Sequence, residues 1–503
     1  MSPSALWGAS ESLALSAAGA QQPVIGKKKK MKTIITLLLL LPSLIVAQSP
    51  WNGTSGFAQV SSNEENPPLR GQMFYWFFPP RNGDMNAPMM IWLQGGPGSS
   101  GIAEGLLKLN GPYSVALTID GLGARLMPRG TTWNEDYAML YVDSPVGTGY
   151  SYQTSGNYAT SQAVISEMLI QTLEHVYAEG LWPSSNGLYV AGESYGGHYC
   201  PSLGASILRK KLSPGGTPVD LKGVAIGDGF TDPATQVVTK PKAAYYMGLV
   251  DEKTRDQAQI YADQAASYAN IGNYEQAASF RNSMENLILS TSQINGYDIR
   301  TFEQYDDSTI EDFLNNATTK QLLNVPANVT FGTSPQVSAN LQGDIMRSYK
   351  AEVETLLGMG IPVLLYQGQM DWKDGATSND AWINTMYPDT VFSEREVLGV
   401  TTTRDIRDPF GILPIHSITT VAPYGWIRQL QTDIVAGYTG ITLYDVVIAA
   451  AGHLVPYDQP IAAKDMITRF ISGNLTLAGN NRVRRYGPVD EEKQNRLRGN
   501  VAN

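Results

Sequence analysis

Cysteine is almost absent from this sequence, because the 503 residues include only Cys200. A single cysteine excludes an intramolecular disulfide and any zinc site built from several cysteine ligands. Cys200 precedes Pro201 and has no evident activating partner, so we expect it to be a buried structural thiol. Basic residues are also few, with 36 Lys and Arg against 46 Asp and Glu and a net charge of −10. An acidic chain lacks the electrostatic surface that binds nucleic acid, and we predict no nucleic-acid partner.

Apolar runs long enough to cross a membrane are missing, and one shorter run stands out near the N-terminus. It covers residues 34–46, is interrupted by Pro42, and follows a cluster of five lysines. A basic segment, about a dozen apolar residues and a small residue predict a secretory signal peptide over residues 31–47. An N-terminal anchor is the alternative, although the run is short for a membrane span. Residues 1–30 form an extension without an interpretable pattern, and we expect no membrane association after the signal is removed.

Entry into the secretory pathway agrees with four Asn-x-Ser/Thr sequences that could accept glycans. We therefore expect the protein to be secreted or delivered to a vacuole or lysosome, although few secreted proteins lack disulfides. The four acceptor residues are Asn52, Asn316, Asn328 and Asn474.

Short apolar runs alternate with longer helical or loop segments along most of the chain, which indicates an α/β protein with a mostly parallel sheet. Residues 163–179 carry apolar side chains at helical spacing, as expected of a helix that covers the sheet. The predicted strands are Met89–Leu93, Met139–Asp143, Leu188–Ala191, Gly223–Ile226, Val363–Gln367 and Tyr444–Ala450.

The segment 231–346 differs from the rest because it lacks strand-like runs and is rich in Ala, Gln, Asn and Tyr. Its helical periodicity, clearest over 251–269 and 274–289, predicts a mostly helical insertion over one end of the sheet. We call this segment the cap. The core of the protein is then expected in two parts, residues 48–230 and 347–481, and the charged tail 482–503 is predicted to be disordered.

The most informative motif is Gly192-Glu193-Ser194-Tyr195-Gly196, which follows a predicted strand directly. A serine hydroxyl becomes a nucleophile when the backbone exposes it and a neighbouring base takes its proton. Glycines around the serine allow a tight strand-to-helix turn at the edge of a sheet. We predict Ser194 to be a catalytic nucleophile.

Only four histidines can supply the base: His175, His198, His416 and His453. His175 lies in a predicted helix, His198 is too close to Ser194 along the chain to fold back onto it, and His416 lies in an irregular segment. His453 follows the last predicted strand, where a loop residue can reach the sheet edge that carries the serine. We therefore predict His453 to be the base.

A carboxylate that orients the histidine is expected between the serine and the histidine in the chain. Asp371 follows the predicted strand Val363–Gln367 most closely, and we favour it. Asp374, three residues later, is the alternative.

A glycine-rich loop, residues 94–101, follows the predicted strand Met89–Leu93. Backbone N–H groups in such a loop can point at an oxyanion, so Gly96 and Tyr195 are predicted to donate to the tetrahedral intermediate. The loop is not a nucleotide-binding P-loop, because no Gly-Lys-Ser/Thr follows it.

The chain contains four long motifs in a characteristic order: Trp92–Ser100, Val142–Tyr152, Gly192–Gly197 and Gly452–Pro460. In order and spacing they resemble the serine carboxypeptidase family, and the insertion together with Gly368–Asp371 is most similar to its vitellogenic-like and retinoid-inducible branches. The resemblance covers about residues 71–473 and implies an α/β-hydrolase fold with a helical cap. It also implies removal of C-terminal residues at acidic pH, with Ser194, Asp371 and His453 as the triad and with no metal or cofactor.

The resemblance also implies that Gln94, Gly95 and Glu193 bind the terminal carboxylate of the substrate. Two neighbouring carboxylates cannot both stay ionised, so Glu193 is expected to hold a proton in that complex. Many members have Asn at the position of Gln94. Where members often have a second acid, this chain aligns Leu109, so we expect that acid to be missing.

The sequence thus predicts a serine carboxypeptidase that acts on peptides or proteins. Two alternatives remain: an acyltransferase or esterase with the same triad, and a catalytically silent scaffold protein on the same fold. A homodimer is also left open.

Overall fold

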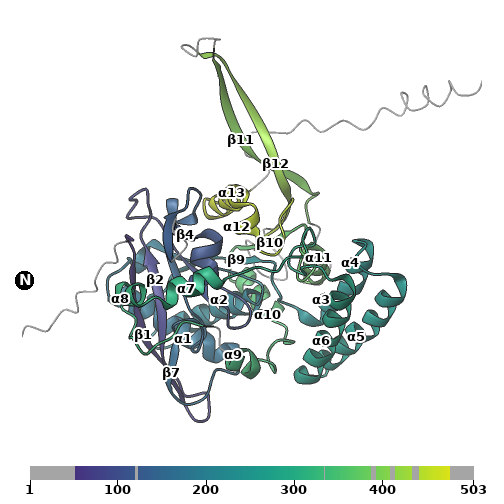
Figure 1. The fold of residues 1–503 in the computed structure, drawn as a ribbon, viewed down its shortest axis with the longest axis horizontal. Helices are drawn as coiled ribbons and strands as arrows, with labels where there is room; N and C mark the ends of the chain where they lie inside the picture. Colours follow the sequence, from purple (N-terminus) through teal and green to yellow (C-terminus); the bar gives the residue numbers. More distant parts are fainter. Residues whose placement is uncertain are drawn as a thin grey trace, which may run out of the picture. The chain divides into compact units, whose positions relative to one another are not determined.

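The central feature of the computed structural model is a mixed sheet of eleven strands in the order β1-β2-β6-β3-β8-β9-β10-β13-β12-β11, with β7 paired to β2 (Figure 1). The structure describes residues 51–118, 123–332, 335–386, 392–407, 414–432 and 441–475. The strands from β6 to β13 in this order are parallel, and antiparallel strands flank them at both ends. The strands of this sheet are β1 (Thr54–Ser62), β2 (Leu69–Phe78), β3 (Met89–Leu93), β6 (Ala138–Val142), β7 (Tyr152–Ser155), β8 (Leu188–Glu193), β9 (Leu221–Gly227), β10 (Val363–Gly368), β11 (Glu396–Arg407), β12 (Pro414–Thr432) and β13 (Ile441–Ile448). A separate hairpin pairs β4 (Tyr113–Leu117) with β5 (Ala124–Pro128).

All six strands predicted from the sequence are confirmed, with bounds that differ by a few residues at most. They are the buried central strands, where both faces are covered and the apolar run is continuous. The antiparallel strands at the two ends of the sheet were not predicted from the sequence. Among them, β11 and β12 form a long hairpin that extends away from the neighbouring helices (Figure 1), and His416 lies in this strand pair rather than in an irregular segment.

Two hydrophobic cores lie on the two faces of the sheet, because alternate side chains of each strand point in opposite directions. On β3, Ile91 belongs to the core that α1 (Gln162–Ala178) and α2 (Gly196–Leu212) cover. Trp92 belongs to the opposite core, which η1 (Gly101–Asn110) and α13 (Pro460–Ile471) cover. The predicted helix over 163–179 is therefore confirmed as α1. The short elements of the core are η2 (Trp133–Glu135), η3 (Ser184–Asn186), α10 (Lys350–Gly358), α11 (Ala376–Ile383) and α12 (Val455–Asp458).

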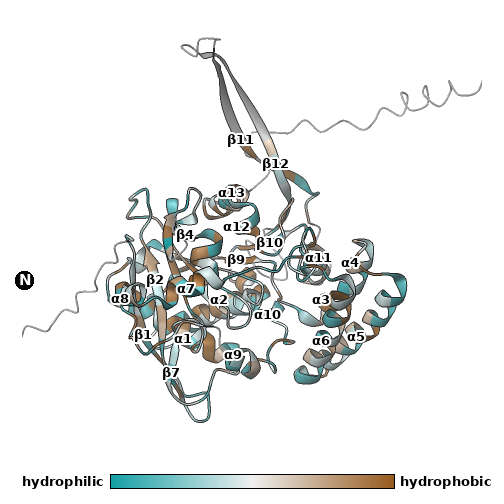
Figure 2. Ribbon diagram, viewed as in Figure 1, coloured by the Kyte–Doolittle hydropathy of each residue, from teal (hydrophilic) through white to brown (hydrophobic). Residues whose placement is uncertain are grey.

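The chain between β9 and β10 contains helices and no named strand in the described residues. The two long helices, α5 and α6, pack against each other (Figure 1). Buried alanines at positions 258, 262, 265 and 269 give α5 a smooth apolar face, and its exposed face is hydrophilic (Figure 2). Asp251 caps α5 by accepting a hydrogen bond from the N–H of Thr254 at 2.8 Å. The helices are α3 (Pro233–Val237), α4 (Lys240–Tyr246), α5 (Glu252–Asn270), α6 (Tyr274–Ser292), α7 (Ser308–Asn315), α8 (Ala317–Leu322) and α9 (Pro335–Asn340).

The predicted signal peptide, the extension before it and the predicted disordered tail lie outside the described residues. Within the described residues, none of the helices combines the length and the apolar character that a membrane crossing requires. The asparagines of all four predicted glycosylation sequences are exposed.

Candidate active site

The candidate site lies at the edge of the sheet where β3, β8, β9, β10 and β13 end, because parallel neighbours bring their carboxyl ends together. Ser194 follows the last residue of β8, and His453 lies in the loop between β13 and α12. Both side chains line one pocket of about 200 Å³.

Ser194 occupies a sharp turn between β8 and α2. Its φ is +62°, a left-handed conformation that is rare for a residue with a side chain. The turn is held by hydrogen bonds from Ser194 N to Gly227 O at 2.9 Å and from Phe230 N to Ser194 O at 3.0 Å. The serine is partly exposed to the pocket, while Tyr195 beside it is buried. The backbone thus presents the Ser194 hydroxyl at the N-terminus of α2.

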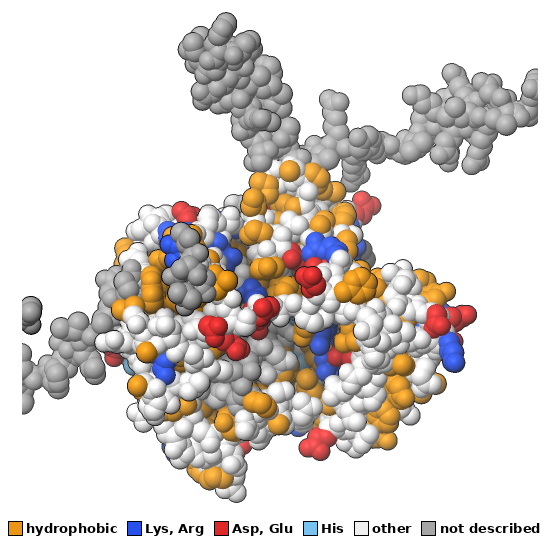
Figure 3. All heavy atoms as spheres, in the orientation of Figure 1, with side chains coloured by type: hydrophobic (Ala, Val, Ile, Leu, Met, Phe, Trp, Pro, Cys, Tyr) orange, Lys and Arg blue, Asp and Glu red, His pale blue; other side chains and the backbone are white. Residues whose placement is uncertain are grey.

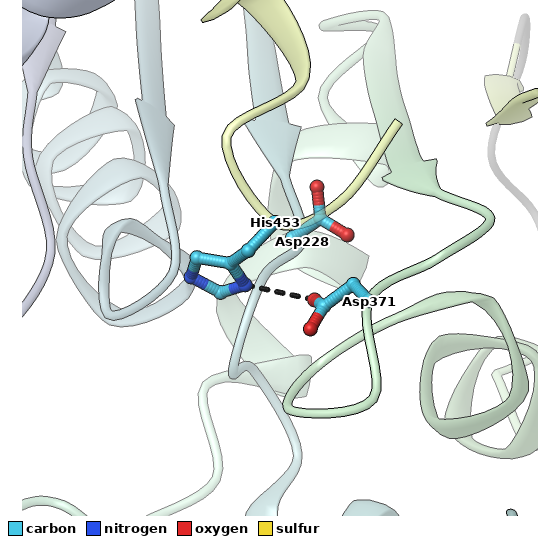
Figure 4. A group of neighbouring side chains, drawn as sticks. All are labelled: Asp228, Asp371 and His453. Atoms are coloured by element: carbon cyan, nitrogen blue, oxygen red, sulfur yellow. Dashed lines mark hydrogen bonds and ion pairs between the residues drawn. The ribbon is translucent and has the colours of Figure 1, made fainter. Parts of the chain in front are cut away.

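His453 is buried and is oriented from two sides. Its Nδ1 hydrogen-bonds to Asp371 Oδ2 at 2.8 Å (Figure 4), and its backbone N–H donates to Tyr297 O of the cap at 2.7 Å. The ring of Tyr297 also packs on the imidazole, with 4.8 Å between ring centroids. Nε2, the other ring nitrogen, has no hydrogen-bond partner in the parts of the chain that the structure describes. Nε2 is therefore free to accept a proton from a group in the pocket.

The electrostatic surroundings of His453 favour its charged form. Burial works against a charged imidazole, but the Asp371 carboxylate and its hydrogen bond outweigh burial and raise the pKa of His453 above its ordinary value. Asp371 is itself fixed by Lys373 N, which donates to Oδ1 at 2.6 Å, and by Asp374 N, which donates to Oδ2 at 3.1 Å. A carboxylate held in this way can orient the imidazole and stabilise its positive charge.

Asp374, the alternative acid of the sequence analysis, has a different role in the structure. Its Oδ1 accepts a hydrogen bond from Lys240 Nζ at 3.2 Å, and the Lys240 side chain is only 1 % exposed. Lys240 also bonds to Glu285 of α6 at 2.8 Å. Asp374 is thus part of a buried ion cluster between the cap and the turn that carries Asp371.

The glycine-rich loop after β3 packs closely against the turn at Ser194. A Cβ atom on Gly95 would lie 2.5 Å from Tyr195 N and 2.7 Å from Ser194 Cβ, so this position can hold only glycine. Gly96, with a φ of +109°, lines the pocket together with Ser194. The structure therefore brings together both residues that were predicted to bind an oxyanion.

Glu193 lies just behind the pocket and is fully buried. Gln94 bridges it to the core: its Nε2 donates to Glu193 Oε1 at 3.3 Å, and its Oε1 accepts from Trp92 Nε1 at 2.8 Å. Burial raises the pKa of Glu193 to about 8. Glu193 Oε2 has no partner in the described part of the chain, so the carboxyl has a free position for a further hydrogen bond.

An acid that the sequence analysis expected to be missing is present at another position. Glu104 of η1 lines the pocket, burial raises its pKa, and its charge contributes to the raised pKa of Glu193. It lies five residues before Leu109, where the alignment placed the missing acid. Spacing alone did not reveal it, because η1 is a π-helix and changes which residues face the pocket.

Several other pocket residues were not identified from the sequence. Lys108 of η1 forms an ion pair with Asp307, which precedes α7 of the cap. Tyr305 lies beside this pair, with its ring centroid 5.4 Å from Lys108 Nζ. The cap residues had no recognisable signal in the sequence, because nothing in a helical insertion marks the residues that turn toward the core.

Figure 3 shows acidic side chains gathered across the middle of this face of the molecule, below the base of the β11–β12 hairpin.

His198, Cys200 and His175 do not belong to the site. His198 is buried, stacks on the ring of Tyr195 and bonds through Nδ1 to Phe230 O at 2.5 Å. Cys200 is a buried free thiol whose pKa is raised by burial, as expected of a structural cysteine. His175 lies on α1 and is paired with Tyr75 Oη at 3.5 Å.

The sequence matches known proteins over most of its length. The sequence model of the serine carboxypeptidase family matches residues 45–473. A probable serine carboxypeptidase (CPVL) of Dictyostelium discoideum is 32% identical over 81% of this chain and 77% of its own length. Serine carboxypeptidase-like 50 of Arabidopsis thaliana is 31% identical over 89% of this chain and 97% of its own length.

Among solved structures, the prohormone-processing carboxypeptidase Kex1Δp of Saccharomyces cerevisiae superposes with a TM-score of 0.67. It is 21% identical, over 84% of this chain and 92% of its own. At that identity the likeness concerns the fold alone, and the fold is that of the α/β-hydrolases. The match over most of the chain shows that this protein belongs to the serine carboxypeptidase family and is a serine-type carboxypeptidase.

Proposed function

We propose that this chain releases single residues from the C-termini of peptides and proteins through an acyl-enzyme formed on Ser194. The observation that carries the proposal is the 2.8 Å hydrogen bond between His453 Nδ1 and Asp371, which leaves Nε2 free in the residues described. His453 and Ser194 line the same pocket.

The proposed reaction has two halves. His453 Nε2 takes the proton from Ser194 Oγ as the oxygen attacks the last peptide carbonyl, and a C–O bond forms. His453 then gives that proton to the departing nitrogen, and the peptide C–N bond breaks. A water molecule, activated by the same imidazole, hydrolyses the ester and regenerates Ser194. Asp371 stays ionised throughout and stabilises the imidazolium.

Negative charge develops on the carbonyl oxygen in both halves. We assign its stabilisation to the N–H groups of Gly96 and Tyr195, which belong to two segments in close contact. Tyr195 precedes the first turn of α2, so the positive end of a 17-residue helix adds to the stabilisation.

We assign recognition of the free C-terminus to Glu193, Gln94 and Gly95. A protonated Glu193 can donate a hydrogen bond to a carboxylate, whereas an ionised Glu193 would repel it. This role fits a carboxyl group that remains protonated up to a pH of about 8. The pocket of about 200 Å³ beside Gln94 is then the site of the departing residue.

The active form carries one proton on Glu193 and none on His453. A second proton, gained on His453 at low pH, removes the base, and loss of the Glu193 proton at high pH weakens substrate binding. We therefore propose a bell-shaped pH profile, in which the acid limb is set by His453 and the alkaline limb by Glu193. We also propose that the chain enters the secretory pathway and is glycosylated, because the four acceptor asparagines are exposed.

Digestion of peptides followed by mass spectrometry tests this function. A series of peptides is incubated over a range of pH, beside the Ser194→Ala variant and beside the same peptides with amidated C-termini. Sequential loss of single C-terminal residues from the free peptides supports the proposal. Transfer of acyl groups to added alcohols without release of amino acids would identify the acyltransferase instead.

A further inference from the structure

A second buried aspartate adjoins the proposed triad and has no part in the mechanism above. Asp228 follows β9 and is 0% exposed. One carboxylate oxygen of Asp228, one of Asp371 and one ring nitrogen of His453 all lie within 4.8 Å of one another (Figure 4). Because His453 Nδ1 bonds directly to Asp371, we interpret the cluster as the catalytic pair with an additional acid beside it.

The position of Asp228 is fixed by the strand ends on both sides. Its backbone N–H donates to Tyr366 O of β10 at 2.8 Å, and its Oδ1 accepts from Gly368 N at 2.9 Å. The adjoining Gly227 O accepts the N–H of Ser194. The turn at Asp228 thus lies between the turn that carries the nucleophile and the turn that carries Asp371.

Asp228 Oδ2 has no hydrogen-bond donor within the described ranges of the chain. A buried carboxylate oxygen without a donor is costly, and a second carboxylate nearby adds repulsion. A proton on Asp228 removes both penalties, because the O–H can donate to Asp371. Electrostatics agree: burial, together with Asp371 and Glu193, raises the pKa of Asp228 well above its usual value.

The partners of the two acids indicate which one holds the proton. Asp371 accepts hydrogen bonds from two backbone N–H groups and from His453, and each of them stabilises its ionised form. Asp228 accepts one, from Gly368 N. The groups that face Asp228 are acidic or neutral on most sides: Glu193 from β8, Tyr366 from β10 and Asp371, whereas His453 can become cationic.

We propose that Asp228 is a positioning residue of this site, which stays protonated and donates a hydrogen bond to Asp371. The two acids then carry one negative charge between them, and that charge is held on Asp371 beside His453. The hydrogen bond fixes the carboxylate plane and keeps Asp371 from taking the proton of the imidazole. This inference rests on the proposed function of the triad.

Two substitutions at Asp228 test whether the side chain acts as a neutral hydrogen-bond donor or as a negative charge. Asp228→Asn keeps an N–H donor toward Asp371 and an acceptor for Gly368 N, but it cannot ionise. Its kcat should stay within about 3-fold of the wild type, and the acid limb of kcat/KM should not move. Asp228→Ala leaves Asp371 without this donor, and its kcat should fall by about 10-fold to 100-fold.

Infrared spectroscopy detects the proton without an assay of activity. The difference spectrum between the wild type and Asp228→Asn should contain the carbonyl stretch of a protonated carboxylic acid at neutral pH. Asp445→Asn is the control, because Asp445 is buried but is paired with Arg428 rather than with an acid. Asp445→Asn should change the stability of the protein and leave the pH dependence of kcat/KM unchanged.

The proposal is overturned by any of three results. These are an acid limb that moves down by about one pH unit in Asp228→Asn, the absence of the acid band, or a wild-type kcat in Asp228→Ala. If Asp228→Ala does not fold, the other two results decide. The rate at which a fluorophosphonate labels Ser194 compares the wild type with the Asp228 variants without a peptide substrate. Failure of the carboxypeptidase assay alone would therefore affect only the proposed function and not the proposed role of Asp228.

Discussion

The buried carboxyl groups close to His453 have different partners, and the partner sets the role of each. Asp371 bonds to the imidazole, Asp374 bonds to a buried lysine, and Glu193 bonds to a neutral amide. The residue type is therefore a poor guide to the role of an acidic side chain. The same carboxyl group is a charged acceptor in one environment and a protonated donor in another.

The sequence could predict Ser194 and His453, because a motif and a strand end mark them. It favoured Asp371 over Asp374 only by distance along the chain, and the structure separates them by their partners. Asp228 has the same strand-end position as the other site residues, so a search of every strand end would have found it. Glu104 could not be found in that way, because its orientation depends on the winding of η1.

Asp371→Asn should impair catalysis, whereas Asp374→Asn should mainly impair stability. Asp371→Asn removes the charge that stabilises the imidazolium, so kcat should fall by about 10⁴-fold with little change in folding. Asp374→Asn weakens a buried ion pair and should lower the thermal stability while kcat stays within about 10-fold of the wild type. Steady-state kinetics and thermal unfolding of the two variants check this. Equal kinetic losses would argue against the assignment of Asp371.

Glu193→Gln should remove the alkaline limb of substrate binding. In the wild type Glu193 is protonated below a pH of about 8, so its hydrogen bond to a terminal carboxylate is lost as the pH rises through that value. Glutamine donates at every pH, so KM should rise steeply above pH 8 in the wild type and stay level in the variant. Measurement of KM for a blocked dipeptide across this range checks the prediction. A variant with the pH profile of the wild type would contradict the role of Glu193.

At the scale of elements, the turn that carries Asp371 is held by the cap. Lys240 of α4 and Glu285 of α6 form a buried ion cluster with Asp374, and Trp372 Nε1 donates to Lys240 O at 3.1 Å. The backbone N–H of His453 donates a hydrogen bond to Tyr297 O of the cap. The cap therefore fixes both Asp371 and His453, the proposed catalytic pair, and also contributes residues to the wall of the pocket.

Glu285→Ala should destabilise the protein strongly. Burial alone would raise the pKa of Glu285, but Arg281, Lys240 and Lys373 outweigh it and hold that pKa far below its usual value. Removal of this carboxylate leaves buried cations uncompensated and should cost about 3–5 kcal/mol in the free energy of unfolding. Urea unfolding measures the change.

Glu275→Ala is the matched control for this experiment, because Glu275 is an exposed residue of the same helix. It should change the free energy of unfolding by less than about 0.5 kcal/mol. Similar losses in the two variants would show that the buried cluster does not stabilise the cap.

The elements that the sequence predicted well are those with continuous burial. The central strands read as apolar runs because both of their faces are covered. The run Met73–Phe78 of β2 is apolar and buried, but it was not used as a strand signal. β11 and β12 interrupt their apolar residues with Thr, Gly and other polar or charged residues, so no long apolar run marked them. Pairing along a long hairpin forms them, and such pairing cannot be seen in local composition.

At the scale of the whole molecule, the family and the fold were predictable because four motifs far apart in the chain occur in the order and spacing of one family. The signal peptide, the acidic working pH, the homodimer and the final compartment stay predictions.

Expression through a secretory pathway should give a glycosylated protein. Asn52, Asn316, Asn328 and Asn474 are exposed, so each can be reached by the glycosylation machinery. Treatment with an amide-cleaving glycosidase should lower the mass and convert each occupied asparagine to aspartate, which peptide mass spectrometry locates. An unmodified secreted protein would contradict the prediction.

The most direct test of the catalytic site is to label the protein with a fluorophosphonate and map the adduct by mass spectrometry. The site described here predicts one adduct, on Ser194, with a rate that falls by orders of magnitude in His453→Ala while the fold is retained. No adduct, an adduct on another serine, or labelling of Ser194 that is unchanged in His453→Ala would contradict it.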